Sequence, residues 1–88
     1  MITFEMAKSI YKKQYPNYLI SSALDVGDEY VFSSRDKESG EELDISPIAI
    51  NKDSGAIRVF FPPLNIDKLK NAITINIESN EYKWFANS

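Results

Sequence analysis

Residues 45–63, "ISPIAINKDSGAIRVFFPP", leave this chain few alternatives to a β-hairpin, because two short apolar runs flank a polar, glycine-containing loop. Alternation within each run places side chains of one kind on one face of a strand. The first strand has Ile48 and Ile50 on one face, and the second has Ile57, Val59 and Phe61. Pro62 and Pro63 end the second strand, since neither can donate a backbone hydrogen bond.

The intervening "NKDSG" predicts the turn of that hairpin. Gly55 suits the left-handed position that closes such a loop, and Asn51 or Asp53 can accept hydrogen bonds from backbone amides within it. A calcium loop needs a longer run of oxygen ligands and a distal acid, both of which are missing. We therefore predict a turn and no metal site.

The segments on either side predict a helix and two more strands. Residues 3–15 have apolar side chains at helical spacing, with Thr3 as the N-cap and Pro16 beyond the end. Residues 18–24 and 29–34 are rich in strand formers and are joined by the reversal "DVGDE". In the second of these strands Tyr30 and Phe32 share a face.

After the double proline, residues 65–73 predict a short helix and residues 73–78 a last, half-buried strand. We expect Asn65 to cap this helix, with Ile66, Leu69 and Ile73 on its apolar face. The chain of 88 residues has room for one modest core, so we expect one domain over residues 1–88. The element order predicts an α+β fold in which an N-terminal helix packs on a curved antiparallel meander of about four to five strands, of the cystatin-like kind.

Composition removes several classes of function. A net charge of −3 argues against a nucleic-acid binder, which needs a concentrated basic surface. Without cysteine or histidine the chain has no thiol chemistry, no Ser–His pair and no usual metal ligands of that kind. Its carboxylates lie in turn-like segments, where water keeps them ionised. We predict no enzyme, no catalytic residue and no cofactor. With no export signal and no bilayer-spanning run, we predict a cytoplasmic protein that does not bind membranes.

The aromatic residues are the candidate contacts. Phe60 and Phe61 are adjacent, so one of them must face away from the Ile57 side of its strand. Exposed aromatic side chains commonly anchor partners, although in small proteins they also complete cores. The predicted partner contacts are Tyr30, Phe60, Tyr82 and Trp84, with Asp25, Asp28 and Glu29 as electrostatic partners.

The succession "QYP", "GDEYVFSS" and "ISPIAINKDSGAIRVFFPP" resembles small bacterial domains of the immunity-protein-35 type, over about residues 5–62. The matching positions are Gly27, Tyr30, Phe32, Pro47, Ile48, Ile50, Lys52, Ser54, Gly55 and Ile57. The hairpin also resembles the "D-x-x-T-G-E" element of PepSY domains. The first resemblance implies a non-enzymatic role, namely binding and neutralising a co-encoded toxin.

From these features we predict a small binding protein, an immunity-type inhibitor of a bacterial toxin whose basic cleft an acidic surface would suit. Two alternatives remain open. The chain could pair with itself as a homodimer through an exposed sheet edge, such as residues 73–78, or hold a small molecule between helix and sheet.

Overall fold

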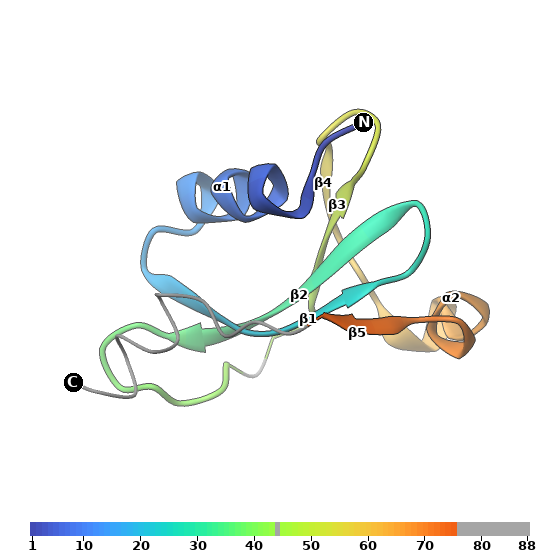
Figure 1. Cartoon of the computed structure of the whole chain (residues 1–88). Coiled ribbons are helices and arrows are strands. Elements are labelled where there is room, and N and C mark those ends of the chain that lie inside the picture. The colour runs from blue at the N-terminus through green and yellow to red at the C-terminus, as the bar shows by residue number, and fades with distance from the viewer. Residues whose placement is uncertain (44, 76–88) are drawn as a thin grey trace.

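The computed structural model describes residues 1–43 and 45–75, in which one helix lies over a five-stranded antiparallel sheet (Figure 1). The elements in chain order are α1 (Phe4–Gln14), β1 (Tyr18–Asp25), β2 (Glu29–Asp36), β3 (Ile48–Asn51), β4 (Ile57–Val59), the 3₁₀ turn η1 (Pro62–Leu64), α2 (Ile66–Lys70) and β5 (Ile73–Ile75). The predicted α+β fold, with its N-terminal helix and a short helix before the last strand, is confirmed. The rest of the predicted 73–78 strand lies outside the described residues.

Helix α1 begins and ends where its sequence predicts. The Thr3 side chain accepts a hydrogen bond from the Met6 amide at 3.1 Å, which satisfies one of the amides that the first turn leaves unpaired. Tyr15 takes a non-helical conformation directly before Pro16. The helix is therefore fixed by local signals at both ends.

The strands lie in the order β4-β3-β2-β1-β5, and every pair is antiparallel. Strands β1 to β4 follow one another as a meander. The chain then leaves the β4 edge through η1 and α2 and returns as β5 beside β1, at the opposite edge. We call residues 60–72, which make this passage, the crossover. The sequence predicts its short helix but not the pairing of β5 with β1.

The β3–β4 turn has the predicted chemistry. Gly55 has φ +75°, in the left-handed region, and the Asn51 side chain accepts from the amides of Asp53 and Ser54 at 2.8 and 2.9 Å. A Cβ at Gly55 would also stand 3.3 Å from the Ile10 side chain of α1, so the loop packs close beneath the helix.

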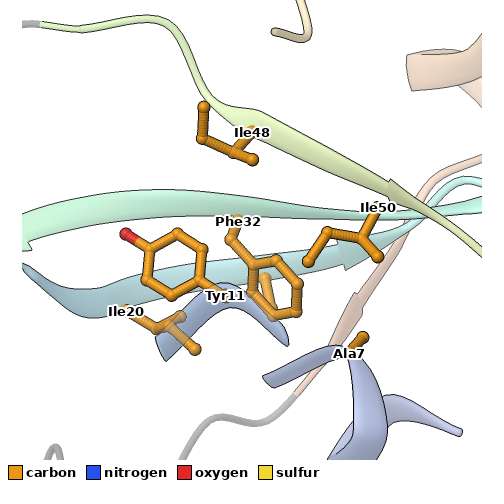
Figure 2. Close-up of a cluster of buried hydrophobic side chains, with 7 residues drawn as sticks. Ala7, Tyr11, Ile20, Phe32, Ile48 and Ile50 are labelled. Carbon is orange, nitrogen blue, oxygen red and sulfur yellow. The ribbon is translucent and has the colours of Figure 1, made fainter. Parts of the chain in front are cut away.

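The main core lies between α1 and the sheet, and the labelled side chains converge there in Figure 2. Its buried members are Ala7, Tyr11, Ile20, Ala23, Phe32, Ile48 and Ile50. Tyr11 and Ser34 share a buried hydrogen bond between their hydroxyls, so the one polar group that the helix buries here is satisfied. Burial raises the pKa of Tyr11.

A second core lies on the opposite face of the sheet, under the crossover. Its buried members are Val26, Val31, Ala49 and Phe60, and Leu24, Leu69 and Ala72 pack against them. Phe60 is 1% exposed and Phe61 is 49% exposed, which answers the question that their adjacency raises. Phe60 is the ring that faces away from Ile57, because the crossover covers that face.

Two predictions about the last third of the chain are wrong. Ile66 and Ile73 are exposed, so only Leu69 of the predicted apolar face packs on the core. The Asn65 side chain does not cap α2; its amide donates to the Phe61 carbonyl at 2.8 Å instead. For Ile66 and Asn65 the physical reason is the same: α2 has only five residues and follows a tight 3₁₀ turn, so its orientation is set by that turn. Ile73 lies beyond α2, as the first residue of the edge strand β5.

Candidate binding surface

The predicted acidic residues lie in and around the β1–β2 turn, and the fold brings a basic side chain to each of them. Gly27, with φ +106°, makes the reversal, and its amide donates to Asp25 Oδ1 at 2.9 Å. The neighbouring β3–β4 turn is tied to this one by a bond from the Lys52 amide to the Asp28 carbonyl at 3.0 Å. Two hairpin turns therefore meet at one end of the sheet.

Asp25 is paired with Lys52 across these turns. Lys52 Nζ donates to Asp25 Oδ1 at 2.7 Å and also lies 4.8 Å from the centre of the Tyr30 ring. The bond from Lys52 holds the pKa of Asp25 below its ordinary value. On its other side Tyr30 packs edge-on against Phe4, at 5.4 Å between ring centres. Tyr30, one of the predicted contacts, is thus half-buried and engaged by residues of its own chain.

Glu29 is the most buried of the acids, at 4% exposed, and it lies on the second face of the sheet beside Val31. Arg58 donates two hydrogen bonds to its carboxylate, from Nε at 2.6 Å and from Nη2 at 2.7 Å. Lys68 of α2 adds a third at 2.8 Å. These bonds, those from Arg58 first, lower the pKa of Glu29 from 4.5 to about 2, and Glu29 in turn raises the pKa of Arg58 and Lys68.

Lys68 also donates to both oxygens of Asp28, at 3.0 and 3.2 Å. The three predicted electrostatic partners therefore face three cations of their own chain, and the formal charge of the group sums to zero. Lowered pKa values keep Asp25 and Glu29 ionised at neutral pH, whereas a general acid needs a raised value. Lys68 thus fastens the crossover to the sheet, while Lys52 joins the two turns.

The other aromatic residues predicted as partner contacts have different outcomes in the structure. Phe60 belongs to the second core, where the crossover covers its ring. The prediction that Phe60 contacts a partner is therefore wrong, because its side chain is not at the surface. Tyr82 and Trp84 lie outside the described residues. Phe61, which we did not select, is the ring of that pair which reaches the surface.

The surface that sequence reasoning missed is apolar. Of the large apolar side chains that are exposed in residues 1–43 and 45–75, four follow one another closely in the chain: Val59, Phe61, Leu64 and Ile66. We call these four residues the apolar run. The predicted strand face of Ile57, Val59 and Phe61 exists, but α1 covers only Ile57, since β4 is the edge strand. The signal was the double proline, which forces an exposed turn directly after an apolar strand.

Within the described ranges, no group of three or more acidic side chains is placed to hold a metal ion. No helix described there is both long enough and apolar enough to cross a bilayer. Comparison with protein-family models, with curated proteins and with solved structures finds no match. The resemblance to immunity-protein-35 and PepSY domains stays a prediction.

Proposed function

We propose that this chain is a small non-enzymatic binding protein that holds a partner protein through the exposed apolar side chains at the end of β4 and directly after it. The apolar run is the observation that carries the proposal. Four large apolar residues exposed within eight positions cost solubility, and such surfaces commonly mark sites of protein contact. Val59 is the last residue of the edge strand β4, and Phe61, Leu64 and Ile66 lie on the crossover.

The internal ion pairs support binding through this run rather than through the acidic turn. Asp25, Asp28 and Glu29 already have basic partners, so a second protein would have to displace Lys52, Arg58 or Lys68 to reach them. Displacing a partner of the buried Glu29 would leave its charge without compensation, which is costly. Apolar side chains that are already exposed carry no such penalty.

For the partner, we propose a protein toxin that the chain neutralises by occupying its surface. The resemblance to immunity domains supports this class, and so does the net charge of −3, which favours association with a basic toxin surface. The role needs tight binding and no turnover.

Co-purification with the product of the neighbouring gene tests the proposal. The wild-type chain should form a complex, and the L64D/I66D double variant should bind at least about tenfold more weakly, because contacts at an interface centre carry most of the binding energy. Both sites are exposed, so the variant should keep the thermal stability of the wild type. I73D, an equally polar change at an exposed site on β5, is the matched control.

No complex with the neighbouring product, or a complex that survives L64D/I66D and is lost in I73D, would contradict the proposal. The first result would reject the toxin as partner, and the second would move the contact to the β5 edge.

A further inference from the structure

Strand β4 has one open edge. It pairs only with β3 among the strands that the structure describes, and it stands last in the sheet order (Figure 1). The Phe60 amide donates to the Pro47 carbonyl at 2.8 Å, and the Asn51 amide to the Ala56 carbonyl at 2.9 Å. Ala56 and Phe60 therefore turn their backbone groups toward β3.

The hydrogen-bonding groups of successive residues in an antiparallel strand point to opposite edges, so Arg58 faces β3 like Ala56 and Phe60, and the residues that alternate with them face the other way. Ile57, Val59 and Phe61 thus direct their backbone groups to the open edge. Phe61 is still extended, with φ −91° and ψ 106°. Its carbonyl already accepts from the Leu64 amide and the Asn65 side chain, so at the open edge it contributes its N–H.

The same alternate residues carry the side chains on the α1 face of the sheet, and two of them are exposed there. Val59 is 61% exposed and Phe61 nearly half exposed. Backbone groups without a strand partner and uncovered apolar side chains therefore coincide on one short segment. A row of this kind is a template for another β-strand.

We propose that a second copy of this chain pairs with β4 in antiparallel fashion, about a two-fold axis at Val59. Each Val59 then exchanges hydrogen bonds with Val59 of the second copy, and each Phe61 N–H donates to the Ile57 carbonyl of the other chain. Across the junction Val59 faces Val59 and Ile57 faces Phe61, so every pair on the α1 face is apolar. This goes beyond the proposed function: of the apolar run the dimer uses Val59 and Phe61, which a foreign partner would reach on the monomer, and it does not use Leu64 or Ile66.

Charge and backbone chemistry disfavour three nearby registers. An axis at Arg58 would set two guanidinium groups directly opposite each other, which is destabilising. An axis at Phe61 would oppose Val59 with Pro63, which has no N–H to donate. An axis at Ile57 would oppose Val59 with Gly55 and bring the two β3–β4 turns together. With the axis at Val59, Arg58 is opposed by Phe60 and no like charges meet.

The ends of β4 limit the length of the pairing, and the two-fold axis closes it, since each copy uses its β4 edge once. The turn at residues 51–55 bounds it on one side and Pro62 on the other. A three-residue strand buries less than the roughly 1,200 Å² of a standard interface, so the dimer should depend on concentration. The other sheet edge, β5, is described only as far as Ile75, whereas β4 is described over its whole length.

Light scattering of the full chain over a range of concentrations tests the proposal. The wild type should pass from monomer to dimer mass as concentration rises. V59K and V59E should each raise the dissociation constant by about tenfold or more, because the axis sets like charges face to face. I73K, a matched control that is 67% exposed on β5, should dimerise like the wild type.

Mixing V59K with V59E tests the register directly, because only a pairing centred on residue 59 places the two opposite charges next to each other. The mixture should recover dimer mass that neither variant forms alone. A wild type that stays monomeric throughout, or a V59K that dimerises as the wild type does, would overturn the proposal. Monomeric variants whose mixture also stays monomeric would overturn the Val59 register. None of these results depends on whether a toxin binds Leu64 and Ile66, so the two proposals fail separately.

Discussion

On the α1 face of the sheet, an eleven-residue helix buries aromatic and branched side chains, whereas on the opposite face a five-residue helix adds only Leu69 to the core and is joined to Asp28 and Glu29 by ion pairs of Lys68. Tyr11, Phe32 and Ile50 fill the first core with almost no exposed surface. The second core is smaller, and its rim is the Glu29 carboxylate with Arg58 and Lys68.

The difference between the two faces indicates which interactions stabilise this protein and which conditions weaken them. Apolar burial is indifferent to pH and only weakly sensitive to salt, while a carboxylate held by two cations depends on its own ionisation. One face should therefore respond to loss of volume and the other to protons. Substitutions on the two faces can separate these terms.

The largest effect should come from Phe32→Ala on the α1 face. Phe32 is completely buried among α1 and three strands, so the variant loses apolar contact and leaves a cavity. We expect the free energy of unfolding to fall by about 3–5 kcal/mol, measured by urea denaturation. Phe61→Ala, at an exposed ring of the same size, should cost less than about 0.5 kcal/mol. If both variants lost a similar free energy of unfolding, the different burial of Phe32 and Phe61 would have no effect on stability, and the prediction would be wrong.

Phe32→Ala removes much of the stability of a small domain and could leave no folded protein to measure. Ile50→Val is the milder variant in the same core and should cost about 1 kcal/mol. A neutral Ile50→Val would contradict the tight packing that the α1 face shows.

The next effect in size should come from Glu29→Gln on the opposite face, and it should depend on pH. The pKa of Glu29 is about 2 in the folded protein against an ordinary 4.5, so the unfolded chain binds more protons between these values. The stability from this carboxylate is fully present above about pH 5 and is lost as pH falls toward 2. We expect Glu29→Gln to cost about 2 kcal/mol at pH 7, less than a fully buried pair because Arg58 and Lys68 are partly exposed.

Urea denaturation of both proteins between pH 7 and pH 2.5 measures this, and the gap between wild type and Glu29→Gln should narrow as the pH falls. Asp67→Asn is the control, since it removes the same charge from a fully exposed side chain of α2. A gap that stays constant with pH would mean that the Glu29 ion pairs contribute nothing to the second face.

The same two faces show which features the sequence could predict. The Thr3 cap, the Asn51 and Gly55 turn and the Tyr30/Phe32 face all depend on residues a few positions apart, and all are confirmed. The bonds of Glu29 reach over 29 positions to Arg58 and 39 to Lys68, so they exist only once the strand order is known. Local patterns do not encode that order, nor the return of β5 to β1.

The candidate surface follows the same division. The sequence places Asp25, Asp28 and Glu29 in and around one turn, as the structure does, but their cations come from the β3–β4 turn, β4 and α2. The sequence alone does not place these cations beside the three carboxylates, so it predicts an acidic surface where the structure has a neutralised cluster. The sequence does not predict that the side chains of Val59 and Phe61 are exposed. Alternation shows which face of the strand they share, but whether that face is covered depends on where α1 lies in the fold.

The smallest global effect, and the most local one, should come from Lys68→Met, which keeps the side-chain stem and removes its charge. Arg58 would still hold Glu29 with two bonds, and the exposed Asp28 pair contributes little, so the unfolding free energy should fall by no more than about 1 kcal/mol. The local consequence should be larger, because Lys68 is the ionic link between α2 and the sheet. Amide hydrogen exchange at Leu69, which donates to the Asn65 carbonyl, should quicken several-fold, while exchange at Ala7 in α1 should stay within about twofold. Equal acceleration at Leu69 and Ala7 would mean that the two faces open together, and the division between an apolar face and an ionic one would then have no energetic meaning.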